Sequence, residues 1–220
     1  MRDSAFRALV VMLAVASVLA TGCSKAVEGR PVAGSSEGVL DDSKCTKVDA
    51  PLTTIPPAAG SSDEFEPTLR VPQPDGWDRF TDLDSAVIRF AMGNPHLKVA
   101  DRAASAVVTI ESQPGELDPN TYFEEGRQSL VSVFGATDMT FVDGTLCGLP
   151  AQTVRYIIPQ MGSGSPVPAT VVITVVHSGG KTYGTALTIQ SPVPDDPVYK
   201  KDAEDILTGF QVLAPNLGAR

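Results

Sequence analysis

The order of the sequence patterns predicts an α+β domain, with a largely antiparallel sheet of about 6 to 7 strands packed by two main helices. Strand-like segments come in blocks and do not alternate with helices, which favours this class over a doubly wound parallel sheet. Two amphipathic segments begin with a proline, as helices often do. The chain has 220 residues, of which 42% are hydrophobic. A folded part of about 150 residues can therefore bury a core that needs no metal.

Three strand patterns come first. Residues 68–71 form a short one that ends in a turn rich in proline and glycine. Trp77 and Phe80 follow this turn, and we expect both to anchor the core. Residues 85–91 read as a strand with Val87, Arg89 and Ala91 on one face, and the β-branched run 106–111 is typical of a buried strand. These segments predict three strands in succession.

A helix is predicted next. Asp118 can cap its first turn, Pro119 suits the first helical position, and Gly135 can end it. Its apolar residues at helical spacing are Phe123, Leu130, Val131 and Phe134. We expect them to face the core.

Four further strands and a closing helix complete the pattern. The strands are expected near residues 139–142, 151–158, 170–177 and 182–190, and Ser178–Gly180 joins the last two as a tight hairpin. Pro197 opens the closing helix. The residues on its predicted apolar face are Tyr199, Ala203, Ile206, Leu207 and Phe210.

The last predicted strand has two unlike faces. Tyr183 and Leu187 fall on one face, whereas Gly184, Ala186 and Thr188 fall on the other. A helix or a ligand can approach such a small-residue face closely. Helix packing is the expected reading, because two amphipathic helices are available to cover it.

The N-terminus carries an export pattern. Arg2 and Arg7 flank the start of the apolar run 8–20, which is long enough for a signal peptide and too short to span a bilayer. Residues 19–23 (LATGC) resemble the lipobox of bacterial lipoproteins. That resemblance implies that residues 1–22 are a lipoprotein signal peptide and that Cys23 is acylated. The alternative is an ordinary signal peptide with Cys23 as a plain thiol.

A flexible tether is expected to follow the acylated cysteine. Residues 23–66 show no helical or alternating periodicity and are rich in proline, glycine and serine. Such a coil holds the body roughly 35 Å from the lipid surface. We therefore predict a tether over residues 23–66, a single folded domain over residues 67–215, and a short tail over residues 216–220.

Cysteine parity predicts a disulfide. If Cys23 is acylated, only Cys45 and Cys147 remain, and export places them in an oxidising compartment. Closing a loop of about 100 residues stabilises a fold by about 4 to 5 kcal/mol in the chain-entropy model. Two buried reduced thiols are the alternative.

Five segments carry a family resemblance: 69–77 (LRVPQPDGW), 88–95 (IRFAMGNP), 134–139 (FGATDM), 145–150 (TLCGLP) and 202–210 (DAEDILTGF). Together they resemble the LpqN/LpqT family of mycobacterial lipoproteins. The resemblance implies an envelope lipoprotein with a body similar to the Mog1/PsbP-like α/β/α sandwich, a fold used for binding and scaffolding. It supplies no catalytic motif.

The sequence shows no compelling catalytic or metal-binding pattern. The one nucleophile-elbow match, Gly34–Gly38, lies in the predicted tether without a strand before it. His96 and His177 have no metal-ligand or triad partner at a diagnostic spacing. Asp82 and Asp84 are read as solvated carboxylates beside a turn. We therefore expect no catalytic residue, no metal and no cofactor, and a protein that is not an enzyme.

Three functions remain to be compared. The first is a binding or scaffold module, an adaptor for an envelope protein or transporter in cell-envelope assembly or envelope lipid transport. The second is a carrier of an apolar envelope ligand between sheet and helix, bound by side chains such as Trp77, Phe80 and Tyr183. A hydrolase is the least favoured. The membrane, through the acyl chains, and an envelope protein are the expected partners on the outer face of the cytoplasmic membrane. The formal net charge of −9 argues against nucleic acid.

Overall fold

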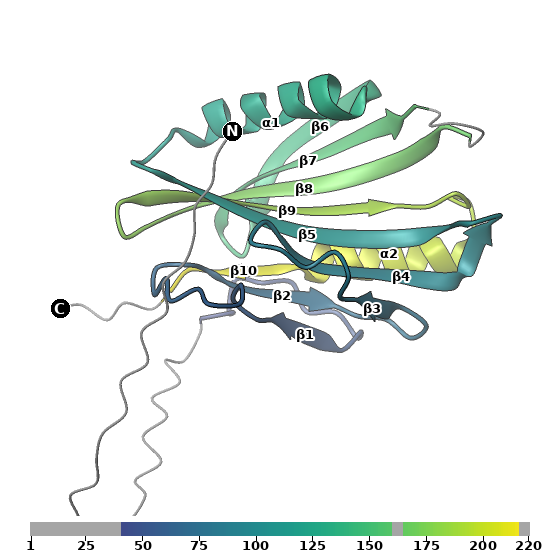
Figure 1. The fold of residues 1–220 in the computed structure, drawn as a ribbon, viewed down its shortest axis with the longest axis horizontal. Coiled ribbons are helices and arrows are strands. Elements are labelled where there is room, and N and C mark those ends of the chain that lie inside the picture. Colours follow the sequence, from purple (N-terminus) through teal and green to yellow (C-terminus); the bar gives the residue numbers. More distant parts are fainter. Residues whose placement is uncertain (1–40, 160–164, 216–220) are drawn as a thin grey trace, which may run out of the picture. The chain divides into compact units, whose positions relative to one another are not determined.

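A computed structural model describes residues 41–159 and 165–215 (Figure 1). Within them the chain forms a seven-stranded and a three-stranded antiparallel sheet with two α-helices. The predicted α+β class is thereby confirmed. The predicted signal peptide, Cys23 and the predicted tail from residue 216 lie outside the described residues. Neither helix in the described ranges is long and apolar enough to cross a bilayer.

The large sheet holds most of the predicted strands. In spatial order its strands are β3 (Asp78–Phe80), β4 (Ile88–Val99), β5 (Arg102–Pro114), β9 (Lys181–Gln190), β8 (Val167–Ser178), β7 (Leu149–Ile158) and β6 (Thr137–Leu146). Each neighbouring pair is antiparallel. The strand β4 continues through Asn94-Pro95, although an Asn-Pro pair is typical of a turn. The register of β4 with β5 shifts between Asn94 and Lys98. Pro95 lies within this irregular stretch, where a strand can accommodate a residue without a backbone N–H.

The small sheet corrects the predicted tether. It consists of β1 (Leu52–Ile55), β2 (Thr68–Pro72) and β10 (Gln211–Leu213), with β2 in the centre. The sequence assigned residues 23–66 to a flexible tether, yet β1 pairs with β2 over four residues. The folded body therefore includes part of that segment. Its order depends on pairing with β2 and on the disulfide to Cys147, 102 residues away, and local periodicity reveals neither.

The predicted disulfide joins Cys45 to Cys147, with their Cα atoms 4.1 Å apart. Cys147 lies in the two-residue turn between β6 and β7. The bond thus fixes the segment before β1 to the end of the large sheet that contains β6.

Local signals set the helix ends. In α1 (Pro119–Phe134) the Asp118 carboxylate accepts hydrogen bonds from the backbone N–H groups of Asn120 and Thr121. Gly135 ends α1 with φ 65°, a left-handed conformation that glycine adopts without strain. Asp196 caps α2 (Pro197–Gly209) in the same way. Both predicted helices are confirmed.

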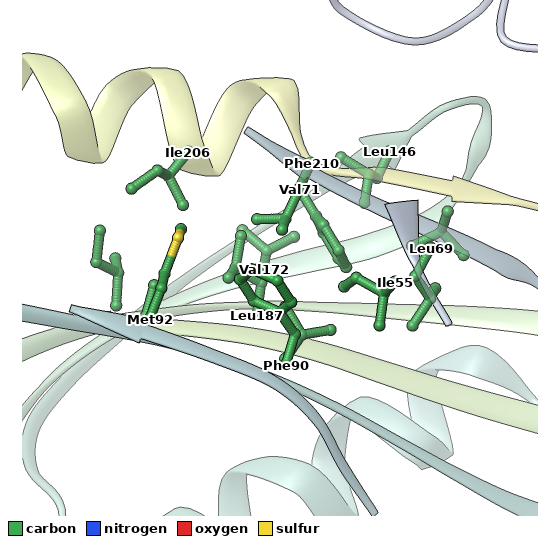
Figure 2. Packing of buried hydrophobic residues seen from close by; sticks show 14 of the residues in the cluster. Ile55, Leu69, Val71, Phe90, Met92, Leu146, Val172, Leu187, Ile206 and Phe210 are labelled. Carbon is green, nitrogen blue, oxygen red and sulfur yellow. The ribbon is translucent and has the colours of Figure 1, made fainter. Parts of the chain in front are cut away.

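The two faces of the large sheet pack against different layers. On one face, α2 and the small sheet bury the larger core, which includes Ile206, Phe210, Val71 and Leu187 (Figure 2). On the opposite face, α1 packs over β7 and β8 through residues such as Phe123. Figure 1 shows α1 on one side of the sheet and the small sheet on the other.

Helix α1 covers the small-residue face of β9, as expected. A Cβ atom added at Gly184 would lie 1.7 Å from the hydroxyl oxygen of Tyr122 in α1. No residue larger than glycine fits there without displacing that ring. Burial, followed by the nearby Glu111 and Glu125 carboxylates, raises the pKa of the Tyr122 hydroxyl to about 12. The tyrosine stays neutral against the sheet.

Candidate binding surface

The three side chains predicted to hold a ligand do not form one site. Trp77 is buried, with 2% exposure, and its indole N–H donates a hydrogen bond to the Asp202 carboxylate at 2.9 Å. Phe80, predicted to anchor the core, is 42% exposed and covers Gly93 of β4. Tyr183 is buried under a different segment. The structure therefore does not bring these three side chains together around one cavity.

Tyr183 and Lys181 hold the segment between β1 and β2. The Tyr183 hydroxyl and the Lys181 ammonium both donate to the Asp63 carboxylate, at 2.7 and 2.8 Å. These bonds, with the Lys181 bond the larger cause, lower the pKa of Asp63 below its ordinary value. Burial and the nearby Asp63 carboxylate raise the pKa of Tyr183. Asp63, Lys181 and Tyr183 thus hold the loop between β1 and β2 in place, and their polar atoms are already paired with one another.

A buried ion pair fastens the same segment. Arg89 of β4 donates two hydrogen bonds to the Glu66 carboxylate, at 2.8 and 3.1 Å, and one to the Pro56 carbonyl at 3.0 Å. A surface hollow of about 440 Å³ beside it is lined by Glu66, Arg89 and Tyr183. Because each of these side chains is already engaged, the arrangement is structural.

The histidines are not brought together. His96 is exposed on β4, and His177 lies on β8, which is not a neighbour of β4 in the sheet. The His177 imidazole lies 2.9 Å from the Leu117 carbonyl, to which its Nε2–H donates. Asp84 pairs with Arg79 at 2.7 Å. Within residues 41–159 and 165–215, no group of three histidine, cysteine, aspartate or glutamate side chains could hold a metal ion.

An exposed apolar surface lies where α1 borders β6. We define the α1–β6 surface by Val131, Met139 and Phe141, which line one shallow groove. Phe134 at the end of α1 is exposed as well, and Val142 is exposed on the face of β6 opposite Phe141. Phe141 is 50% exposed and Val142 is 62% exposed, although both belong to a regular strand. Val131 and Phe134, which the helical spacing assigned to the core, are more than half exposed. Met139 alone is half-buried.

A fixed polar frame supports this surface. The Arg127 guanidinium lies 4.1 Å above the Phe141 ring and holds it by a cation–π contact. Arg127 also donates to the carboxylate of Glu124 and to the side-chain carbonyl of Gln152. The Gln152 amide in turn donates to Asp143 at 2.6 Å. The aromatic ring is thus held in place beside a shallow groove of about 380 Å³.

The strand that carries this surface is an edge. β6 pairs with β7 on one side and with no other strand in the part of the chain that the structure describes. From Thr137 to Thr145 only Met139 is even half-buried. An exposed edge strand presents unpaired backbone groups to which another chain can add. Exposed apolar side chains next to such an edge are typical of a docking surface.

Sequence reasoning did not find this surface. The adjacent apolar pair Phe141-Val142 in a strand with few other apolar residues was an available signal, because a strand buried on one face alternates apolar and polar residues. Topology supplies the missing information, since only the strand order shows that β6 has a free edge.

The chain resembles known proteins in structure. No protein-family model and no curated protein sequence matches the chain. The crystal structure of LpqN of Mycobacterium tuberculosis, described as involved in cell envelope biogenesis, superposes with a TM-score of 0.58 at 16% identity, covering 75% of this chain and 93% of that one. The Ran-binding protein Mog1p of Saccharomyces cerevisiae gives a TM-score of 0.44 at 9% identity, covering 77% and 100%. What the LpqN likeness establishes is the architecture: the chain has an LpqN-like α+β fold.

Proposed function

We propose that this chain is an exported lipoprotein whose body is a binding or scaffold module in cell-envelope assembly or envelope lipid transport. The observation that carries the proposal is the pair of exposed apolar side chains on the open edge strand β6, with Phe141 in the α1–β6 surface and Val142 on the opposite face. Burying exposed apolar groups of this kind against a partner is favourable by about 25 cal/mol per Å² before the costs of association. The module works by binding and not by catalysis.

The anchor is the second part of the proposal. The basic start, the apolar run 8–20 and the small residues before Cys23 support export and acylation. Two or three acyl chains hold a protein durably on a membrane, so the body works at the outer face of the cytoplasmic membrane. Replacing Cys23 with alanine should move the protein from the membrane to the soluble fraction. Unchanged partitioning into detergent would contradict the anchor.

LpqN supports the choice of process. It is similar in fold and is described as involved in cell envelope biogenesis. An adaptor docked through its sheet edge suits such a process, because the acyl chains keep it beside membrane-bound envelope enzymes and transporters. The carrier of an apolar ligand has less support, since the α1–β6 groove is open and bordered by Glu124 and Arg127.

Site-specific cross-linking in cells tests the adaptor function. A photoreactive phenylalanine analogue is introduced at Phe141 and, as a matched control, at Val99, which is 53% exposed on β4, the strand next to the opposite edge strand β3. We expect a covalent adduct with one envelope protein from position 141 and none from position 99. Adducts that are absent or equal at both positions would contradict the proposal.

A further inference from the structure

The β6–β7 turn determines which backbone groups of β6 are free. Cys147 and Gly148 form a two-residue turn with φ 52° and 80°, the combination required by a type I′ hairpin turn. In such a hairpin the residues that flank the turn, here Leu146 and Leu149, form a hydrogen-bonded pair. Hydrogen-bonded and non-hydrogen-bonded pairs then alternate along the strand.

Counting back along β6 identifies the free edge. Thr145 opposes Pro150, which has no N–H to donate, so this pair is non-hydrogen-bonded, as the alternation requires. Asp143 and Phe141 occupy the next two positions of the same kind. The backbone N–H and C=O groups of Phe141, Asp143 and Thr145 therefore point away from β7. Among the described residues no other strand receives them.

The side chains beside this edge alternate between two faces. Phe141 and Asp143 lie on the α1 face, as the contacts of Arg127 and Gln152 with them show. Val142 lies on the opposite face. A segment extended along β6 would therefore meet apolar surface on both sides of the sheet.

The charges beside the free edge of β6 indicate which kind of chain can pair with it. On the α1 face the free edge is bordered by the acidic groups Glu124 and Asp143, and Arg127 is already engaged by Glu124 and Gln152. The exposed Arg155 lies opposite Thr140 and so faces away from α1. A second copy of the chain would bring the same acidic groups together, which disfavours pairing of two β6 strands.

We infer that β6 accepts an extended segment of a partner protein as an added strand, with apolar side chains at alternating positions and lysine or arginine beside Asp143. This inference rests on the proposed binding function and specifies its mode. Backbone hydrogen bonds to Phe141, Asp143 and Thr145 supply affinity, and the groove beside Phe141 selects the alternating apolar side chains.

A library of random nine-residue peptides, displayed on phage and selected on the purified full chain, provides the probe. We expect enriched sequences to alternate apolar residues and to carry lysine or arginine. Enrichment of acidic sequences, of sequences without alternation, or of none would overturn the inference.

The affinity of an enriched peptide is then measured for two variants of the protein that differ at Thr145. Thr145→Pro removes an outward N–H and leaves the β6–β7 bonds intact, whereas Thr145→Ala keeps that N–H. Binding should weaken about tenfold or more in the first variant and less than about twofold in the second. Equal binding by both would overturn strand addition.

Modified peptides keep the test independent of how Thr145→Pro folds. Two peptides are made from the enriched sequence, one N-methylated at its odd-numbered residues and one at its even-numbered residues. One peptide should lose binding and the other should bind as before, because only every second N–H group of an added strand faces β6. An equal effect on both peptides would overturn the inference.

Two further outcomes separate this inference from the proposed function. A concentration-dependent dimer that Thr145→Pro abolishes would make a second copy the occupant and overturn the partner assignment. A cellular adduct at position 141 that Thr145→Pro leaves intact would keep the adaptor function and overturn strand addition. If no adduct forms at position 141 while peptides still bind as expected, the adaptor function fails alone.

Discussion

Replacing Gly184 with alanine should specifically destabilise the packing of α1 on the sheet. The added Cβ would lie 1.7 Å from the Tyr122 hydroxyl oxygen and 2.0 Å from its Cζ atom, distances that no real contact allows. The Tyr122 ring must therefore leave its place between α1 and β9. Overpacking of this kind costs about 1 to 3 kcal/mol.

Gly144 on β6 supplies the matched control, since no atom lies within 4 Å of a Cβ added there. Gly144→Ala should change the free energy of unfolding by less than about 0.5 kcal/mol. Urea unfolding of the full chain measures both variants. In a Tyr122→Ala background, Gly184→Ala should lose most of its cost, because the clash partner is gone. Equal costs at Gly184 and Gly144 would refute the close packing of α1 on β9.

Three other predictions concern the contacts that hold the body together. Cys147→Ser should lower the free energy of unfolding by about 2 to 5 kcal/mol, because the disulfide closes a loop of 102 residues; a loss below about 1 kcal/mol in urea unfolding would contradict this. Trp77→Phe should cost about 1 to 3 kcal/mol, because it leaves the buried Asp202 carboxylate without its indole donor; Trp77→Phe combined with Asp202→Leu should recover part of that loss, and no recovery would contradict the pairing. The folded state holds the pKa of Asp63 below the value of about 4 that it has when unfolded, so its contribution is present above that pH and is lost as the pH falls through the folded pKa. Asp63→Asn should therefore lose stability less steeply than the parent in acid unfolding, and parallel curves would contradict this.

The helices could be predicted because their signals are local. Asp118 and Gly135 determine the ends of α1 within a few residues of chain, and Pro197 marks the start of α2. The long strands were also recognisable, since β-branched runs mark them. Their exact limits depend on pairing, so β4 extends beyond the predicted 85–91 segment to Val99.

The short strands β1 and β10 could not be predicted, because pairing with β2 orders them. Leu52–Ile55 and Gln211–Leu213 are too short to show a period, and both are stabilised by pairing with β2. The same limit explains the predicted tether. Cys45 and Glu66 fix that segment through Cys147 and Arg89, which lie far along the chain.

The candidate site could not be predicted without knowing the order of the strands in the sheet. Helical spacing assigned Val131 and Phe134 to the core, but α1 packs chiefly on β7 and β8. Beyond β6 the described chain offers no further strand to cover these side chains. The residue type alone also did not predict where each aromatic side chain lies. Trp77 and Tyr183 are buried with polar partners, whereas the partly exposed Phe80 covers Gly93.

Backbone hydrogen exchange of the full chain, alone and in its cross-linked complex, tests the central claim most directly. In the free protein, the outward amides of Phe141, Asp143 and Thr145 should exchange quickly, because the edge strand leaves them unpaired. In the complex we predict that exchange at these three amides slows by about tenfold or more, with little change in β3 at the opposite edge. Protection confined to β3, or unchanged exchange along β6, would contradict the account.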